Sequence, residues 1–366
     1  ARVRRARITD AKVTDTLFPG TAERYRWRAW RVRSGDALVK LLRDEVFPYL
    51  GSLEAGGAKT DTRDEVAAYF RDARLEIQDP AVLKRVIDEL DQIEFNKLGP
   101  DVKGDLFEYL LQYLGKENQQ VLGQMRTPRQ IRAFMVEMVA PEFADTIYDP
   151  ACGTGGFLVD ALGYVLARYS EAPEEVPIYG EEWLERQGLT LAQAKGRYPQ
   201  LLTYRKGRGD KLPGAWIQVE RAIYGTDVSR QMLRIATMNL ILHGVRRATL
   251  KRANVLSRQG GLSDQDRARR YRVVLSNPPF AGELQKDSIR DDLGTTAKKS
   301  ELLFLALMMD VLAPGGRCAV VVPDGLLFGS TGAHKELRRK LVMTFDLQAV
   351  VSLPAGAFKP YAGVKT

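Results

Sequence analysis

The sequence of 366 residues predicts an α/β protein in which a parallel sheet, covered by helices on both faces, follows an all-helical amino-terminal domain. Two patterns predict this class. Apolar residues recur at helical spacing through residues 36–122, whereas from about residue 128 short apolar strands alternate with amphipathic helices. We therefore expect one domain over residues 1–122 and a second over residues 123–366.

The first domain contains several amphipathic segments. Leu38, Leu41 and Leu42 begin one helical stripe, and Asp79 followed by Pro80 is typical of a helix start, with the acid as cap and the proline in the first turn. A further helix is expected from Gly104 through Leu114.

The second domain contains six apolar segments that predict strands. A helix is expected over Leu302 to Leu312, and the turn residues Pro314, Gly315 and Gly316 separate it from the fifth strand. The expected strands are 146–149, 222–226, 249–253, 272–276, 317–322 and 348–353.

A glycine-rich turn follows the first expected strand, in Asp149-Pro-Ala-Cys-Gly-Thr-Gly-Gly-Phe157. Glycines allow the backbone to turn tightly and approach a ligand closely. The spacing differs from the G-x-G-x-x-G of dinucleotide-binding proteins, so no pyrophosphate clamp is implied. Asp149 suits a ligand with an ammonium group, such as the methionine moiety of S-adenosylmethionine. The alternative is a purely structural turn.

Two further polar residues follow expected strands. Asp227 ends the second strand, where an acid in this type of sheet accepts hydrogen bonds from ribose hydroxyls. Asn254 follows the third strand, where such folds contact the adenine ring of a cofactor.

The fourth expected strand leads into Asn277-Pro-Pro-Phe280. The Asn277 side-chain oxygen and the Pro278 carbonyl can each accept one N–H of a planar amine, and Pro278 and Pro279 donate no backbone N–H. Phe280 offers a flat face for a base. The alternative is a strand followed by an ordinary turn. The order of these motifs predicts a Rossmann-like, S-adenosylmethionine-dependent amino-methyltransferase.

These motifs resemble those of the modification (M) subunits of type I restriction–modification systems, which are N6-adenine DNA methyltransferases. Gln124-Met-Arg-Thr-Pro-Arg129 is similar to a family segment that lines the cofactor pocket, and Val351 through Thr366 to the family's strand and turn after the catalytic loop. Tyr25 through Trp30 and Leu41 through Leu50 resemble the family's helical domain. Met125-Arg126 stands where the family has two aromatics, and Asn254 where Asp is usual.

The resemblance implies methyl transfer from S-adenosylmethionine to N6 of a flipped-out adenine in double-stranded DNA, with no metal. It implies a complex with a DNA-sequence specificity subunit and leaves a restriction (nuclease/translocase) subunit open as a further partner. Phe358 is expected to hold the base with Phe280. The catalytic residues are then Asn277, Pro278, Pro279 and Phe280. The cofactor residues are Gln124, Thr127, Pro128, Asp149, Ala151, Cys152, Gly153, Thr154, Gly155, Asp227 and Asn254.

Two other functions stay open: methylation of another planar amine, in a protein glutamine or an RNA base, and a non-catalytic DNA-binding scaffold. An insertion over residues 171–215 is expected to be an exposed loop or a contact surface. The sequence begins with Ala and stops where the family continues into another strand, so we expect trimmed ends.

Composition sets broader limits. Two cysteines and two histidines predict neither a disulfide framework nor a catalytic zinc site. No apolar run suits a membrane span and no signal peptide is evident, so the expected location is cytoplasmic. The net charge is +9, and ten Arg and Lys lie in the first 35 residues beside Tyr25, Trp27 and Trp30. This segment suits DNA phosphates, a solvated surface or an acidic partner.

Overall fold

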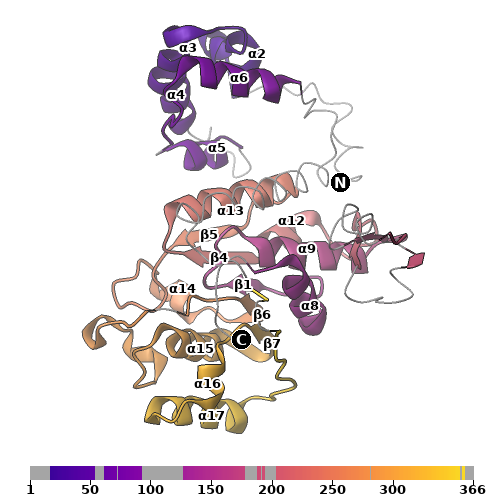
Figure 1. Ribbon diagram of the computed structural model, residues 1–366, viewed down its shortest axis with the longest axis vertical. Coiled ribbons are helices and arrows are strands. Elements are labelled where there is room, and N and C mark those ends of the chain that lie inside the picture. The colour runs from indigo at the N-terminus through magenta and orange to yellow at the C-terminus, as the bar shows by residue number, and fades with distance from the viewer. Residues whose placement is uncertain are drawn as a thin grey trace. The chain divides into compact units, whose positions relative to one another are not determined.

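A computed structural model of the chain (Figure 1) describes residues 17–53, 62–71, 73–92, 127–177, 188–190, 192–193, 203–280, 282–354 and 357–358. The chain divides into two compact units, residues 2–103 and residues 104–366. Each unit has a hydrophobic core of its own.

The smaller unit is helical in its described part. Its core consists of the apolar stripe around Leu38 and Leu42 packed against Leu83 and Ile87. Asp79 caps a helix as predicted, because its side chain accepts hydrogen bonds from the backbone of Ala81 at 2.8 Å and Val82 at 3.1 Å. The elements are η1 (Gly20–Tyr25), α2 (Trp27–Trp30), α3 (Gly35–Leu41), η2 (Leu42–Val46), α4 (Phe47–Gly51), α5 (Thr62–Phe70) and α6 (Pro80–Asp91). The helix expected from Gly104 through Leu114 lies outside the described residues.

The described part of the basic segment is held by ion pairs within this unit. Arg24 contacts Glu45 at 3.0 Å, and Arg26 contacts Glu23 at 3.0 Å. Arg31 pairs with Asp91 of α6, whose other oxygen accepts a hydrogen bond from the Trp27 indole at 2.9 Å. These arginines therefore contribute to the packing of the helices, and residues 1–16 lie outside the described part.

The larger unit contains a five-stranded parallel sheet in the order β5-β4-β1-β6-β7. Its strands are β1 (Ile147–Asp149), β4 (Ile223–Asp227), β5 (Thr249–Arg252), β6 (Tyr271–Ser276) and β7 (Leu312–Val320). The sequence predicted these five, although β7 begins before the Pro-Gly-Gly turn and is bulged opposite β6.

The sixth predicted strand, 348–353, is wrong: these residues form no strand. The side chains of Val350 and Val351 are 61% and 48% exposed. Apolar β-branched residues favour an extended chain, but a strand also needs a neighbour that offers backbone hydrogen bonds. Within the described part of the chain, no strand pairs with this segment.

Alternating residues of the sheet face two different helical layers. Ile147, Val273 and Leu275 pack with α8 (Arg129–Val139), α9 (Gly156–Arg168) and α13 (Arg230–Leu242). Tyr148 and Val274 belong to a second core around α15 (Ser300–Val311). This is the period of two that a buried strand requires.

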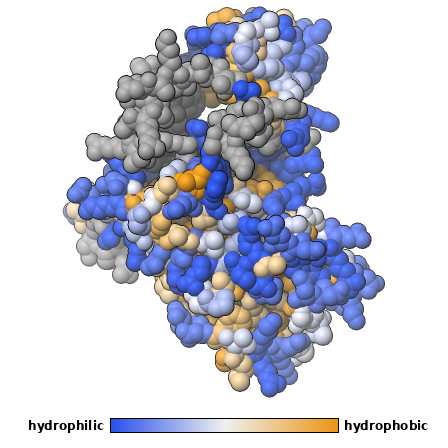
Figure 2. Space-filling model, turned by 180° about the vertical axis from the view of Figure 1, so that it is seen from behind, coloured by the Kyte–Doolittle hydropathy of each residue, from blue (hydrophilic) through white to orange (hydrophobic). Residues whose placement is uncertain are grey.

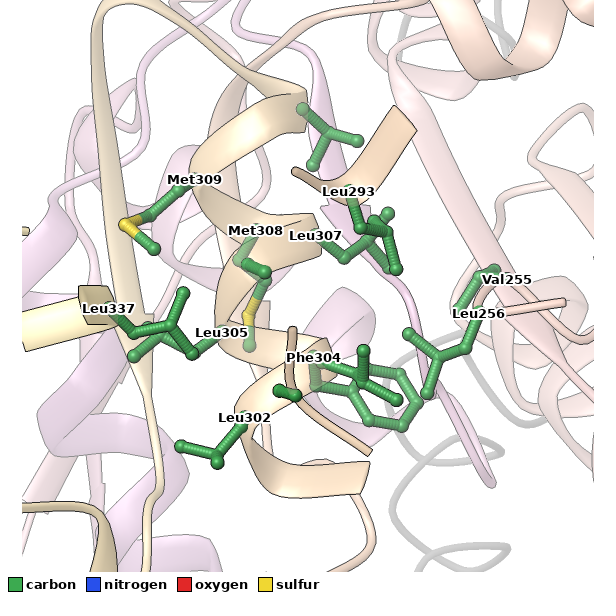
Figure 3. Close-up of a cluster of buried hydrophobic side chains, with 14 of the residues drawn as sticks. Val255, Leu256, Leu293, Leu302, Phe304, Leu305, Leu307, Met308, Met309 and Leu337 are labelled. Carbon is green, nitrogen blue, oxygen red and sulfur yellow. The ribbon is translucent and has the colours of Figure 1, made fainter. Parts of the chain in front are cut away.

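Helix α15, predicted as Leu302 to Leu312, is apolar on every side and buried accordingly. Figure 3 shows its Leu302, Leu305 and Met308 with Leu337 of α17 (Gly332–Thr344) nearby. The remaining short elements are α12 (Trp216–Arg221), α14 (Asp264–Ala268), η3 (Lys286–Ser288), η4 (Asp291–Leu293) and α16 (Asp324–Phe328).

The predicted insertion contains two paired strands. Strands β2 (Glu174–Pro177) and β3 (Thr203–Lys206) form an antiparallel sheet. Gly207 then passes so close to α9 that a Cβ there would lie 2.5 Å from the Cα of Ala167. The described ends of the insertion are therefore tied to the helix after the glycine-rich turn.

Several large apolar side chains are exposed near α16 and α17, and Figure 2 shows orange patches among blue ones at that end of the molecule. Phe328 is 79% exposed and Met343 is 76% exposed. None of the described helices is long and apolar enough to cross a bilayer.

Candidate active site

The predicted site residues follow the carboxyl ends of three adjacent parallel strands. Strand β1 ends in Asp149, β4 in Asp227 and β6 in Ser276, directly before Asn277. Strand β1 pairs with both β4 and β6, so these ends meet at one edge of the sheet. Ligands of open α/β sheets bind at this edge.

The glycine-rich loop turns back over the end of β4. Cys152 donates a backbone hydrogen bond to the Thr226 carbonyl at 2.9 Å. Gly153 and Gly155 have positive φ angles of 52° and 79°, which favour glycine. A Cβ on Gly155 would lie 3.2 Å from the Cβ of Ala236 in α13. The loop conformation and its packing against α13 both require glycine here.

Asp227 ties the glycine-rich loop to β4. Its carboxylate accepts a hydrogen bond from the Gly153 amide at 3.0 Å and another from the Ser229 amide at 2.7 Å. Only 5% of the residue is exposed. Each carboxylate oxygen can accept more than one hydrogen bond, so this geometry leaves acceptor capacity for a ligand hydroxyl.

Asp149 lies deeper and links β1 to β6. Its Oδ1 accepts hydrogen bonds from the Ser276 hydroxyl at 2.7 Å and the Ala151 amide at 3.0 Å. Burial raises the pKa of Asp149 to about 7, and the Asp227 charge acts in the same direction. Both hydrogen bonds from described residues end on Oδ1, so Oδ2 remains for a cationic group.

Cys152 and Thr154 contribute structure around these acids. Cys152 is buried, and desolvation raises its thiol pKa, with Asp149 and Asp227 adding to the effect. A protonated buried thiol is a poor nucleophile. The Thr154 carbonyl accepts a hydrogen bond from the Asn239 side chain of α13 at 3.1 Å.

Asn277 is the least satisfied polar side chain of the site. Its Oδ1 and Nδ2 are both buried, and neither has a hydrogen-bond partner among the described residues. A buried unpaired amide costs free energy, roughly 1–3 kcal/mol for each lost hydrogen bond. Such a group in a native fold requires an explanation, and a ligand amine is the simplest one.

The rest of the loop presents a mixed surface. Pro278 is buried, Pro279 is exposed, and Phe280 is half-buried against the core around α9. Phe358 belongs to that same core and is only 1% exposed. In this structure Phe358 is therefore a core side chain beside the loop.

The remaining predicted cofactor residues are Asn254 after β5 and the segment of Gln124, Thr127 and Pro128 before β1. Asn254 is exposed and its side chain accepts a hydrogen bond from the Leu256 amide at 3.2 Å, while the preceding Ala253 amide donates to the Asp227 carbonyl at 3.0 Å. Gln124 lies outside the described residues, whereas Thr127 is buried and Pro128 is half-buried.

A buried arginine, which the sequence did not single out, places Thr127 against the glycine-rich loop. Arg132 donates to the Thr127 carbonyl at 3.1 Å and forms an ion pair with Asp160 at 2.6 Å. A Cβ on Gly156 would lie 2.9 Å from its guanidinium carbon. Nothing in the local sequence distinguishes Arg132 from the neighbouring Arg129.

Two serines next to the Asn277 loop were also missed. Ser276 is the last residue of β6, and Ser300 is the first residue of α15. Their partners are distant in the sequence, so no local pattern indicates them. Within the described part of the chain, no group of three His, Cys, Asp or Glu residues could hold a metal ion.

Comparison with known proteins identifies the family of this chain. The model of the N-6 DNA Methylase family matches residues 98–194 and 216–366. The EcoEI type I restriction enzyme methylase subunit of Escherichia coli is 31% identical over 360 residues, which are 96% of this chain and 64% of that subunit. The chain thus spans less than two thirds of this relative.

Two solved structures share the fold over the whole chain. A modification subunit of a putative type I restriction enzyme from Vibrio vulnificus YJ016 has a TM-score of 0.70 and 26% identity, with 71% of that chain covered. A structure from a study of the assembly and conformational transition of the type I R-M system has a TM-score of 0.64 and 28% identity, with 63% covered. From its sequence and its fold, the chain belongs to the N-6 DNA Methylase family.

Proposed function

We propose that this chain transfers a methyl group from S-adenosylmethionine to N6 of an adenine in double-stranded DNA, as the modification subunit of a type I restriction–modification system. The observation that carries the proposal is the buried amide of Asn277, which follows β6 beside the end of β1 and has no hydrogen-bond partner among the described residues. Family membership gives the reaction class, and the amide gives the atoms that would hold the substrate.

Asn277 would orient the target amine. Its Oδ1 accepts one N–H and the Pro278 carbonyl accepts the other, which increases the lone-pair density on nitrogen as it becomes tetrahedral. The loop contributes positioning and electrostatic stabilisation. No strong base is needed, because the amine proton can leave after attack. Phe280 offers a face to the extruded base, since a target atom inside the stack must be flipped out.

The two acids would hold the cofactor, which supplies an electrophilic methyl group on a positively charged sulfur. Asp149 Oδ2 suits the ammonium of the methionine moiety, and the Asp227 carboxylate suits the ribose hydroxyls. The positive φ of Gly155 allows the tight turn by which the loop crosses the end of β4 and packs against α13. Thr127, Pro128, Ala151, Cys152, Gly153 and Thr154 line the same edge, and we assign Asn254 to the adenine side.

The expected partners are double-stranded DNA and a DNA-sequence specificity subunit, with a restriction subunit as a further candidate. One related structure comes from a study of complex assembly in the type I R-M system, which supports a multi-subunit complex. Four arginines of the basic segment, Arg24, Arg26, Arg28 and Arg31, form ion pairs with Glu23, Glu45 or Asp91, which favours a structural role for these four over phosphate binding.

The test is the destination of a labelled methyl group. The purified chain, with and without the expected specificity subunit, is incubated with methyl-tritiated S-adenosylmethionine and with duplex DNA, RNA or a protein extract. We expect label in duplex DNA and, after digestion to nucleosides, in N6-methyl-2′-deoxyadenosine. Label confined to RNA or to glutamine in protein would replace our substrate with that planar amine. No transfer to any of them would favour a non-catalytic scaffold.

A further inference from the structure

The loop Asn277–Phe280 is fixed at both ends by buried serine hydroxyls. Ser276 precedes the loop and is fully buried, and Ser300 is 5% exposed at the start of α15. Ser276 contacts Asp149, 127 positions away, and Ser300 contacts the Pro279 carbonyl, 21 positions away. Both are in the core of the larger unit, where a hydroxyl without a partner would be costly.

Ser276 connects the loop to the cofactor side of the site. Its hydroxyl donates to Asp149 Oδ1 at 2.7 Å, and its carbonyl accepts from the Val321 amide at 3.1 Å. The backbone just before Asn277 is therefore anchored to β1 through a side chain and to the end of β7 through the main chain. A hydrogen bond to a carboxylate favours its charged form.

Ser300 connects the other end of the loop to α15. Its hydroxyl lies 3.2 Å from the Pro279 carbonyl and 3.5 Å from a carboxylate oxygen of Glu301, so the proline is the nearer acceptor. Its amide donates to the Gly282 carbonyl at 3.0 Å. Because α15 is buried along nearly its whole length, this contact ties the loop to the core of the larger unit.

These contacts determine which loop atoms are free for a substrate. The Pro279 carbonyl is engaged by Ser300, whereas the amide of Asn277 has no partner among the described residues. Since no described residue forms a hydrogen bond with the Asn277 side chain, we infer its position from the backbone on either side of it.

We propose that Ser276 and Ser300 are positioning residues that hold Asn277 and the Pro278 carbonyl in line with the target amine, and that the Ser276 hydroxyl also favours the carboxylate form of Asp149 that would bind the cofactor. This inference rests on the proposed function. It assigns the two residues different effects. Ser300 should affect methyl transfer alone, whereas Ser276 should affect both methyl transfer and cofactor binding.

The test compares Ser276→Ala and Ser300→Ala with Ser263→Ala as a matched control. Ser263 caps α14, accepts a hydrogen bond from the Asp266 amide at 3.2 Å and donates to Asp266 Oδ2 at 2.6 Å. Ser263 is exposed, and its loss removes a hydrogen-bonded hydroxyl that contacts neither Asp149 nor the loop. For each variant, the midpoint of thermal unfolding, the Kd of S-adenosylmethionine and the single-turnover methylation rate of duplex DNA are measured. The wild-type chain, measured with the same expected specificity subunit, provides the reference.

We expect Ser300→Ala to lower the methylation rate by roughly ten- to a hundredfold, since small displacements of reacting groups have effects of this size, while the cofactor Kd stays within about twofold. Ser300→Thr retains the hydroxyl and should recover most of the rate. Ser276→Ala should also weaken cofactor binding by about tenfold at pH 7, the effect of one hydrogen bond to a charged group.

The pH profile separates positioning from a general loss of structure. Asp149 faces Asp227 of β4, Cys152 of the glycine-rich loop and Tyr148 of β1, none of which is a cation. Without the Ser276 hydroxyl, the pKa of Asp149 should rise further, so the pH below which cofactor affinity declines should move upward. Ser263→Ala should leave this profile unchanged.

Equal rates and Kd values for Ser276→Ala, Ser300→Ala and Ser263→Ala would overturn the inference. The inference would also fail if the lower rates and weaker binding of Ser276→Ala and Ser300→Ala were fully explained by their lower unfolding midpoints. Asn277→Ala, run alongside, distinguishes the two levels of the argument. If Asn277→Ala is inactive and the serine variants behave like the control, only the positioning roles fail. If Asn277→Ala methylates DNA like the wild type, the proposed function itself fails.

Discussion

The protonation of Asp149 should couple cofactor binding to pH. The pKa of this carboxyl is raised from 3.8 to about 7, chiefly by burial. The ligand-free folded protein therefore keeps a proton between about pH 4 and pH 7 that the unfolded chain has lost. The contribution of Asp149 to folding stability therefore falls as pH rises through this range and is constant above it. The difference between a pKa of 3.8 and one of about 7 corresponds to a loss of about 4 kcal/mol in the free energy of unfolding.

Binding of an ammonium group reverses this preference, because the cation favours the carboxylate. Below about pH 7 the protein must release a proton when the cofactor binds, so each unit of acidification should weaken binding roughly tenfold. Between pH 5 and pH 7 the Kd should change by roughly fiftyfold. The measurement stops near pH 7 because an α-amine begins to lose its own proton at about pH 7.7.

Titration calorimetry in buffers with different ionisation enthalpies measures both the Kd and the number of protons released. We expect about one proton at pH 5 and about half of one at pH 7 for the wild type. Asp149→Asn cannot ionise, so its weaker binding should be independent of pH over this range. A wild-type Kd that is equal at pH 5 and pH 7, or a slope that persists in Asp149→Asn, would show that this carboxyl does not bind the ammonium.

Other substitutions test the supporting structure. Gly155→Ala places a Cβ at a φ of 79° and 3.2 Å from the Cβ of Ala236, so the unfolding free energy should fall by roughly 1–2 kcal/mol and the cofactor affinity should fall with it. The control is Gly163→Ala in α9, where a Cβ would have no atom within 4 Å. This substitution should be neutral or should stabilise the fold by up to about 1 kcal/mol. Arg132→Met leaves the largely buried Asp160 without its cation and should cost roughly 3 kcal/mol in denaturant unfolding. Arg168→Met breaks an exposed pair with Glu142 at 3.1 Å and should cost at most about 1 kcal/mol. Equal costs would contradict the burial of the Arg132 pair. Phe358→Ala should lower the unfolding free energy by roughly 3–5 kcal/mol, as expected for a core aromatic; unchanged stability with lost methylation would instead return Phe358 to the base-binding role predicted from the sequence.

The features predicted well from the sequence are those encoded locally. The end of β1 at Asp149, the end of β4 at Asp227 and the start of α6 after Asp79 each follow from a short apolar or capping pattern. The parallel order of the strands then brings Asp149, Asp227 and Asn277 to one edge. Their proximity was predictable because it depends on topology rather than on side-chain detail.

The features that the sequence did not predict depend on distant partners. The Ser276–Asp149 contact joins residues 127 positions apart, and Ser300 reaches Pro279 across a loop. Residues 348–353 have the composition of a strand but no neighbouring strand to pair with in the described part of the chain. Phe358 follows a family pattern, yet its burial is decided by packing against the core around α9.

The most direct test of the central claim is the amount of N6-methyladenine formed in duplex DNA by the wild type and by Asn277→Ala, measured by mass spectrometry of the digested nucleosides. Calorimetry with S-adenosylmethionine on the same two proteins is the control, because Asn277 does not belong to the proposed cofactor set. The account predicts methylation by the wild type, a loss of at least about a hundredfold in Asn277→Ala, and equal cofactor Kd values. Undiminished N6-methyladenine in Asn277→Ala would contradict it.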